Sequence, residues 1–141
     1  MPIILYRLVD SEHDTIKVGD LLNRCSDYSN QKLGDGIYFA DSEDSALKFA
    51  KKGNHKYTHL LKCEITNTSE NDFFDLINTP NAYANWKKLI KDKKVNTSLT
   101  AFCAANGKKG LKWISRKGWV EYVLHKQHVN NNIEIIESKE L

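Results

Sequence analysis

The stretch KLGDGIYFADSEDSALKFAKK, residues Lys32–Lys52, decides the predicted fold of this chain. It contains two glycines, Gly34 and Gly36, which allow a positive φ or the close approach of a ligand to the backbone. The apolar and aromatic residues Ile37–Ala40 follow, so GIYFA predicts a short strand over Gly36–Ala40. A plain hairpin turn is the alternative explanation of the glycines.

A helix is predicted directly after this strand. Asp41 or Ser42 suits its N-cap, and the acidic residues that follow complement the positive end of the helix dipole. Gly53 is expected to end the helix. Its apolar residues recur at helical spacing on one side, and they are Ala46, Phe49 and Ala50.

The rest of the chain predicts short strands and few helices. Apolar runs predict strands over Ile3–Val9, His55–Thr66, Phe73–Ile77, Trp119–His125 and Ile133–Ser138. Helices are expected from Thr79–Pro80 and within Asn96–Gly110, and a short strand and turn around Gly19 within Ile16–Leu22. Because the strands do not alternate regularly with helices, we expect an α+β fold in a single domain over residues 1–141.

Composition excludes several classes of protein. Of the 141 residues 28% are charged, and the apolar runs are too short to span a bilayer. The N-terminus MPIILYRLVD lacks the basic region and the cleavage site of a signal peptide, so we expect a cytoplasmic protein without membrane attachment. The three cysteines and five histidines match no metal-ligand spacing, so no metal is expected.

The charge balance is mildly basic. A net charge of +3 is weaker than that of a dedicated nucleic-acid binder. Lysines gather in Lys87–Lys94 and Gly107–Trp119. These segments are either a solvated helix face and a loop, or a patch that attracts an anion such as a dinucleotide.

Two charged residues stand in apolar strands and are candidates for a site. Arg7 lies within IILYRLV, where its guanidinium needs an anionic partner, either an acidic residue on a neighbouring strand or a bound phosphate. Glu121 lies within WVEYVLH, whose alternation places Trp119, Glu121 and Val123 on one face. Its carboxylate either belongs to a site beside a tryptophan or faces solvent on an edge strand.

Three motifs occur in one order along the chain: an arginine in the first strand, GDGIYFADSEDSALKFA, and WVEYVLHKQHV. This ordered set resembles the ADP-ribosyltransferase superfamily, and specifically the catalytic region of the poly(ADP-ribose) polymerases. In those enzymes a GxGIYFAD stretch precedes a helix, and an EYIVY…QV strand carries the catalytic glutamate. The similarity spans most of the chain, with a poor match from about Thr79 to Lys117. The pair Tyr6–Arg7 looks more like the toxin-type ADP-ribosyltransferases, which begin with a similar LYR.

The resemblance implies a split β-sandwich of short strands, with a few helices around an NAD-binding cleft. It implies NAD⁺ as co-substrate and Glu121, Tyr38 and Arg7 as catalytic residues. Glu121 would stabilise the positive charge on the ribose as the nicotinamide–ribose bond breaks. Arg7 would hold a phosphate or ribose oxygen. The other expected contacts to NAD⁺ are Tyr6, Gly34, Gly36, Ile37, Phe39, Ser42, Ser45 and Trp119, and Phe39 and Trp119 are alternatives to Tyr38 for stacking on nicotinamide.

We expect transfer of a single ADP-ribose instead of chain extension, because the domain is small and has no recognisable accessory domain. We also expect a monomer. Trp119 stands where arginine-modifying toxins often carry a second glutamate, so arginine modification is disfavoured. The acceptor remains open between a protein, a nucleic acid and a small molecule. Ser45 is one residue closer to Tyr38 than the family's serine, so Ser42 and Ser45 are rival contacts to nicotinamide. The alternatives are NAD⁺ hydrolysis, an RNA 2′-phosphotransferase reaction, and a non-catalytic module that binds ADP-ribose or nucleic acid.

Overall fold

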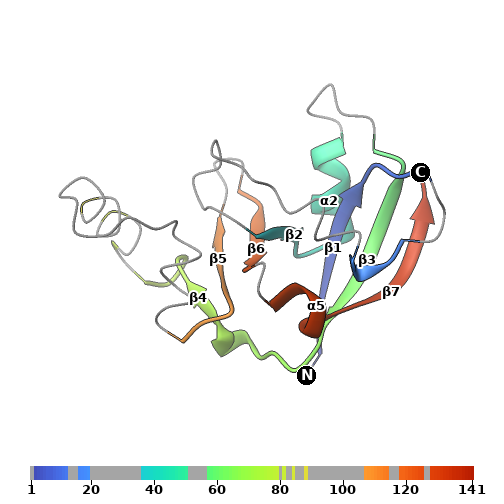
Figure 1. Ribbon diagram of the computed structural model, residues 1–141. Helices are drawn as coiled ribbons and strands as arrows, with labels where there is room; N and C mark the ends of the chain where they lie inside the picture. The colour runs from blue at the N-terminus through green and yellow to red at the C-terminus, as the bar shows by residue number, and fades with distance from the viewer. Residues whose placement is uncertain are drawn as a thin grey trace.

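The computed structural model of the protein describes residues 2–12, 16–19, 36–50, 57–79, 81, 84, 88, 107–114, 118–125 and 128–141. Within them a mixed sheet of seven strands forms the body of the molecule, in the order β4-β5-β6-β2-β1-β3-β7 (Figure 1). The strands are β1 (Ile3–Val9), β2 (Ile37–Ala40), β3 (His59–Ile65), β4 (Phe73–Asp75), β5 (Gly110–Ile114), β6 (Val120–Leu124) and β7 (Ile133–Glu140). The helical elements are α2 (Glu43–Ala50), the 3₁₀ turn η1 (Glu70–Asp72) and α5 (Val129–Asn132). This is the predicted α+β class.

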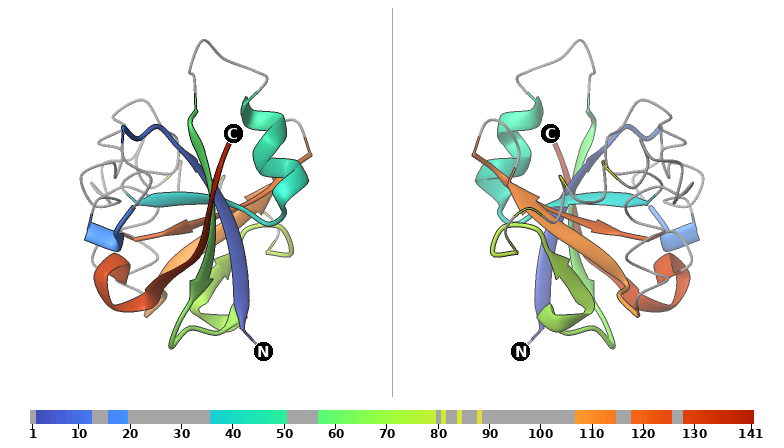
Figure 2. Two further views of the ribbon diagram at one scale, coloured as in Figure 1. Left: turned by 90° about the vertical axis from the view of Figure 1, so that its right-hand side faces the viewer. Right: turned by 90° about the vertical axis from the view of Figure 1, so that its left-hand side faces the viewer.

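In the described part of the sheet, β1 and β2 are joined by fewer residue pairs than any other two neighbouring strands. β1 pairs with β3 along the whole of both strands, from Ile3–Ile65 to Val9–His59. The register joins β1 to β2 at the pair Tyr6–Ala40 alone, within the described residues. Figure 2 shows the consequence, since β1, β3 and β7 run upright while β2, β5 and β6 cross them steeply. The two groups of strands therefore meet at one point and diverge from it.

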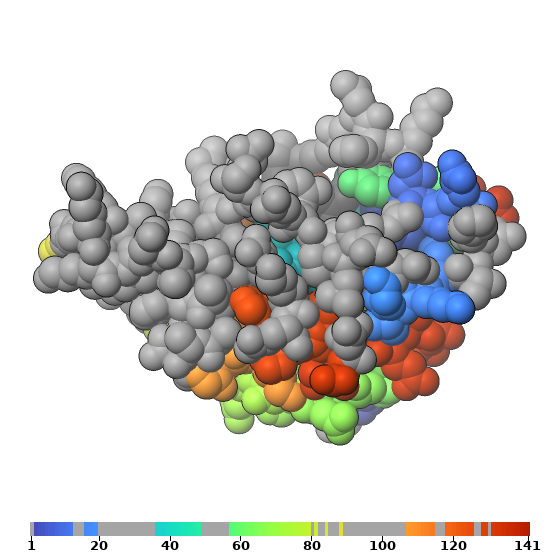
Figure 3. All heavy atoms as spheres, viewed as in Figure 1, coloured from blue at the N-terminus to red at the C-terminus, as the bar shows by residue number. Residues whose placement is uncertain are grey.

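Each face of the sheet has its own packing partner. On one face, residues of every strand group form the main core, and its fully or nearly fully buried members include Leu5, Phe39, Leu61, Cys63 and Leu124. Val129 of α5 completes this core. Figure 3 shows α5 and β7 in red at the surface beside residues 16–19 in blue, whose Ile16 and Val18 pack against the same core.

α2 packs against part of the opposite face, over β1 and β2. Ala46 of the helix is buried with Ala40 and Leu60 of the sheet, and Tyr6, Leu8 and Leu47 pack against them. Successive residues of a strand point to opposite faces, so Tyr6 lies under α2 whereas its neighbour Arg7 points toward the main core.

Several sequence predictions are confirmed. Ile3–Val9 is a strand with the predicted bounds, and the strand Ile37–Ala40 leads into helix α2 as expected. β6 covers Val120–Leu124 of the predicted Trp119–His125, and β7 continues two residues beyond Ser138 to Glu140.

Other predictions are wrong in part. The predicted strand His55–Thr66 begins at His59 and ends at Ile65 in the described part of the chain, and Phe73–Ile77 ends at Asp75. Val18 and Gly19 form a helical turn instead of a strand. α5 was not predicted at all. The helices expected from Thr79–Pro80 and within Asn96–Gly110, the lysines of Lys87–Lys94 and the helix end at Gly53 fall mostly or wholly outside the described residues.

The largest correction concerns Gly107–Trp119, for which the sequence left a loop and an anion-attracting patch as alternatives. Gly110–Ile114 of this segment is strand β5, paired with both β4 and β6. The first residue of this strand is a glycine, which the sequence analysis took as a sign of a loop. A Cβ on Gly110 would lie 1.9 Å from the carbonyl oxygen of Val123. Gly110 is needed for close strand packing and not for a turn.

Candidate functional site

A row of four residues crosses the sheet on the face covered by α2. Trp113 of β5 pairs with Glu121 of β6, Glu121 pairs with Ala40 of β2, and Ala40 pairs with Tyr6 of β1. Residues directly opposite one another in a sheet share a face, so these four side chains lie on the same side. The row brings together the first, second and third motifs of the sequence, which are far apart along the chain.

Glu121 is the chemically distinctive member of this row. Only 9% of its surface is exposed, although it carries a carboxyl group in the middle of a strand. Trp113 donates a hydrogen bond from Nε1 to Oε2 of Glu121 over 3.2 Å. Burial raises the pKa of Glu121 above its usual range, and the hydrogen bond from Trp113 opposes part of that rise. Perturbed, buried carboxyl groups of this kind gather at functional sites.

The surroundings of Glu121 are largely apolar. On one side Leu111 and Val123 are fully buried, with Tyr38, Phe74, Leu76 and Trp113 packed against them. On the other side lies the cluster of Ala40, Ala46 and Leu60 under α2. Moving a charged group out of water costs free energy unless an opposite charge pairs with it. A buried carboxylate at this position therefore lowers the stability of the fold, which argues against a purely structural role for Glu121. The alternative of a solvent-facing Glu121 on an edge strand is excluded, because β6 lies between β5 and β2.

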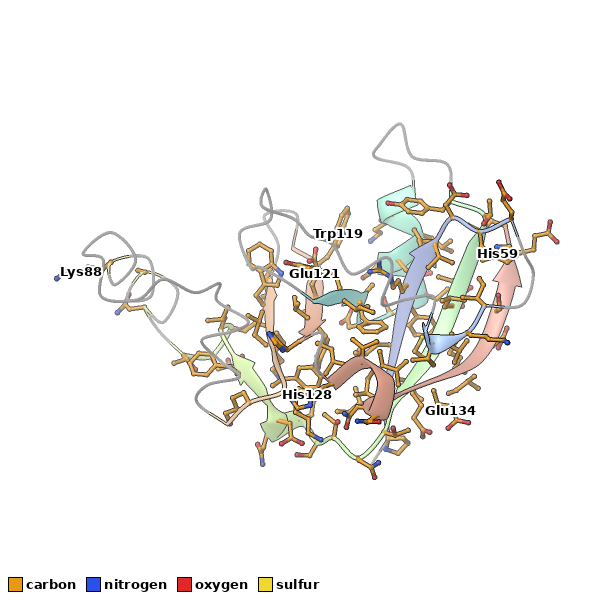
Figure 4. The ribbon with its side chains drawn as sticks, viewed as in Figure 1. His59, Lys88, Trp119, Glu121, His128 and Glu134 are labelled. Atoms are coloured by element: carbon orange, nitrogen blue, oxygen red, sulfur yellow. The ribbon has the colours of Figure 1, made fainter. Side chains whose placement is uncertain are left out.

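The aromatic residues expected to stack on nicotinamide do not all lie on the same face of the sheet. Tyr38 lies two residues before Ala40 and shares its face, half-buried beside Val123. Ile37 and Phe39, at 0% and 2% exposure, belong to the main core on the opposite face. Trp119 precedes β6, and Figure 4 shows it close to Glu121 at the same end of that strand, away from His59 and His128. Tyr38 and Trp119 are therefore the aromatic candidates beside Glu121.

The two serines before and within α2 have different positions. Ser42 is the N-cap, because its Oγ accepts a hydrogen bond from the backbone N–H of Ser45 over 3.1 Å and its carbonyl accepts from Ala46. Ser42 Oγ also donates to Ser45 Oγ over 3.0 Å. The hydroxyl of Ser42 is thus used by the helix, whereas the hydroxyl of Ser45 accepts this bond and keeps its own proton to donate. Asp41, the rival N-cap, is not the capping residue.

Gly36 has a structural explanation of its own. A Cβ at this position would lie 2.5 Å from the carbonyl oxygen of Leu124 and 3.0 Å from a methyl group of Val123. Glycine is therefore required for β2 to approach β6, independently of any ligand. Gly34, its partner in the GDG sequence, lies outside the described residues.

Arg7 lies on the other face of β1. It pairs with Leu61, which belongs to the main core, and its Nη1 donates a hydrogen bond to the carbonyl oxygen of Tyr38 over 2.8 Å. Burial raises the pKa of nearby Cys63 to about 12, and the positive charge of Arg7 opposes that rise. This contact is to the backbone, and the acidic or phosphate partner proposed from the sequence stays a prediction.

Arg7 and Glu121 were expected to face one shared cleft. The register instead places Glu121 beside Tyr6 on the face of α2, while Arg7 alternates to the opposite face. What connects them is β2: the Tyr38 carbonyl accepts the hydrogen bond of Arg7, and Ala40 pairs with Glu121. The first-strand residue that shares the face of Glu121 is Tyr6.

Trp113 contacts Glu121, although the sequence did not single it out. Its segment was interpreted as a loop or as an anion-attracting patch, and the spacing from Glu121 pointed to Trp119 instead. The signal that could have found Trp113 is the alternation of Leu111 and Trp113 after Gly110, a strand pattern obscured by the surrounding lysines and glycines.

Neither a cluster of metal-ligand side chains nor a membrane-spanning helix occurs in the described ranges. No group of three or more histidine, cysteine, aspartate or glutamate residues in them is arranged to hold a metal ion. No helix there is long and apolar enough to cross a membrane.

Comparison with known proteins gives one likeness of fold. No protein-family model matches the chain, and no curated protein matches it. Among solved structures, the chain is similar to the toxin MbcT in the crystal structure of the Mycobacterium tuberculosis MbcT–MbcA toxin–antitoxin complex. The TM-score is 0.56 at 17% sequence identity, over 100% of this chain and 85% of that chain. These comparisons do not link the chain to the poly(ADP-ribose) polymerases. At this level of identity they show a likeness of fold to the solved structure and nothing more.

Proposed function

We propose that this protein binds NAD⁺, breaks its nicotinamide–ribose bond and transfers a single ADP-ribose to an acceptor. The observation that carries the proposal is the buried carboxyl group of Glu121, on one face of the sheet with Tyr6 and Tyr38. These residues come from the three motifs that resemble the ADP-ribosyltransferases. The steep crossing of the two strand groups in Figure 2 supports a split β-sandwich of that superfamily, in one domain.

In this proposal Glu121 acts on the ribose. The C1′–N bond breaks, its electron pair leaves with nicotinamide, and positive charge develops on the ribose ring. A carboxylate that accepts a hydrogen bond from a ribose hydroxyl stabilises this charge, and it does so more strongly in a site shielded from water. The acceptor then supplies an electron pair to C1′ and loses a proton.

The aromatic side chains position NAD⁺. Tyr38 shares the face of Glu121 and supplies a ring against which nicotinamide stacks, with Trp119 as the second candidate. Ser45, whose hydroxyl keeps a proton to donate, is the better candidate for the nicotinamide amide than Ser42. Arg7 supports the strand that carries Tyr38 through the carbonyl of that residue. Its contact to a phosphate or ribose oxygen of NAD⁺ stays a prediction.

A protein partner is also proposed. The similar structure was solved as a toxin–antitoxin complex, which supports a toxin that is held in check by a bound protein. We therefore propose that the active enzyme is a monomer in the cytoplasm. Its inactive form is a complex with an inhibitory protein.

The test is incubation of the purified protein with NAD⁺ labelled in the adenylate part. Release of nicotinamide by the wild-type protein, and its loss in Glu121→Gln, would support the proposal. Separation of protein, DNA, RNA and small-molecule fractions then identifies the acceptor. Label found only in free ADP-ribose would favour NAD⁺ hydrolysis. Glu134→Gln is the matched control, since Glu134 is an exposed strand carboxylate on β7, far from Glu121 in Figure 4.

NAD⁺ binding by calorimetry without any nicotinamide release would instead favour the non-catalytic module. Absence of both binding and release would overturn the proposal.

A further inference from the structure

We propose that Trp113 is a positioning residue, which holds the Glu121 carboxylate in place for its interaction with ribose. This inference rests on the function proposed above and assigns a role to a residue outside the three motifs.

The strand register brings the two side chains together. Trp113 stands directly opposite Glu121 in the antiparallel pair of β5 and β6. In such a pair the Cβ atoms are about 4.5–5.5 Å apart, so the indole reaches the carboxylate from a rigid sheet instead of from a loop. The Nε1–Oε2 hydrogen bond of 3.2 Å follows from this placement. In the part of the chain that the structure describes, Glu121 forms no other hydrogen bond through its side chain.

The chemistry of the indole suits this role. Its N–H group donates a hydrogen bond and accepts none, so it engages a carboxylate oxygen without competing for a proton. Trp113 occupies Oε2 and leaves Oε1 of Glu121 to accept a hydrogen bond from a ribose hydroxyl. Donation to the ionised form also favours the charge that the proposed reaction requires, against the effect of burial.

Packing makes the indole a firm support. Trp113 is half-buried and packs with the cluster formed by Leu111 and Val123. A large ring held by such neighbours has little freedom to move away from Glu121. Positioning of this kind matters because a misplacement of about 1 Å can cost a reaction about a hundredfold in rate.

The experiment compares Trp113→Phe with the matched control Tyr122→Phe. The first change removes the donor to Glu121 and keeps an aromatic ring. The second removes the Tyr122 hydroxyl, which donates to both carboxylate oxygens of Glu70, over 3.0 and 3.1 Å. Tyr122 is the next residue of β6 and points to the opposite face, so the control removes a carboxylate hydrogen bond at the same place in the fold. Circular dichroism verifies that both variants are folded.

The readouts are kcat, KM for NAD⁺ and the dependence of kcat on pH. Trp113→Phe is expected to lower kcat about ten- to a hundredfold, with little change in KM, and to move the acid limb of the pH profile upward. Tyr122→Phe should leave kcat and the acid limb where they are. Wild-type kcat and an unmoved acid limb in Trp113→Phe would overturn the positioning role, while nicotinamide release by the wild-type protein would still support the proposed function.

A measurement on the wild-type protein does not depend on the folding of a variant. The indole Nε1–H signal of Trp113, followed by NMR without NAD⁺, should shift as Glu121 titrates, and this shift should disappear in Glu121→Gln. An indole signal that does not respond to Glu121 would overturn the inference even if the enzyme turns over NAD⁺. A responsive signal in a protein that releases no nicotinamide would mean that the contact exists but that the proposed function, and with it this role, is wrong.

Discussion

The guanidinium of Arg7 donates a hydrogen bond to the backbone carbonyl of Tyr38, and so it adds a side-chain link between β1 and β2. Within the described residues the register joins these two strands at Tyr6–Ala40 alone. The contact from Arg7 reaches β2 two residues before that pair, from the side of the main core. The residue that the sequence suggested as a ligand clamp thus supports the strand that carries Tyr38.

We predict that Arg7→Ala destabilises the fold. The Tyr38 carbonyl loses a charged donor in a half-buried setting, a change that costs about 1–3 kcal/mol of the free energy of unfolding. Melting curves measure this loss, and calorimetric titration with NAD⁺ on the folded variant measures binding. Arg7→Lys is the companion variant, since it keeps the charge but loses the planar fork. Unchanged melting together with lost NAD⁺ affinity would show that Arg7 clamps the ligand directly.

We predict that Glu121→Gln lowers turnover and raises stability at neutral pH. Loss of the charge should reduce nicotinamide release roughly a hundredfold or more, equivalent to a few kcal/mol. The glutamine oxygen can still accept the hydrogen bond of Trp113, so the fold is kept. Full turnover by the purified variant would remove Glu121 from the mechanism.

The pH dependence of stability tests the same residue independently. The folded pKa of Glu121 is raised by burial, so the folded state holds this proton more tightly than the unfolded state. Stability therefore falls as the pH rises from the unfolded pKa through the folded pKa of Glu121, and the cost remains at neutral pH. Glu121→Gln should abolish this fall. Denaturant unfolding between pH 4 and 8 measures the effect, and parallel curves for both proteins would contradict it.

We predict that Ser42 stabilises helix α2, whereas Ser45 contacts the ligand. Ser42→Ala removes the N-cap and should lower the free energy of unfolding by about 1 kcal/mol. Ser45→Ala should cost less stability, because its backbone N–H still reaches Ser42 Oγ, but it should weaken inhibition by nicotinamide if Ser45 contacts the amide. Melting curves and nicotinamide inhibition constants distinguish the two, and the reverse pattern would identify Ser42 as the ligand contact.

We predict that Gly36→Ala disrupts the contact of β2 with β6. The added Cβ would meet the Leu124 carbonyl, which is backbone and cannot turn aside, so a loss of about 1–3 kcal/mol is expected. Gly19→Ala is the control, because no atom of the described residues lies within 4 Å of a Cβ at that position. Thermal unfolding measures both variants. Equal stability of Gly36→Ala and the wild-type protein would mean that the strands can shift apart.

The elements that the sequence predicted are those specified by neighbouring residues. Ile3–Val9 is a continuous apolar run, and GIYFA followed by an N-cap serine and acidic residues contains its own start signals for a strand and a helix. The order of the three motifs was enough to single out Glu121. These predictions needed only local spacing, because the period of a strand or helix is a property of the segment itself.

The tertiary structure alone decided which residues meet. Strand β5 was hidden because Gly110 serves close packing against Val123, a partner that local sequence does not reveal. The register of the paired strands places Trp113 beside Glu121 and places Arg7 on the opposite face from it. A shift of the register by one residue would move each of these side chains to the other face. Sequence alone predicted the candidate residue Glu121 and the local strands and helix of this protein. The assembly of its candidate site depended on non-local strand pairing, because only packing of the whole sheet selects one register.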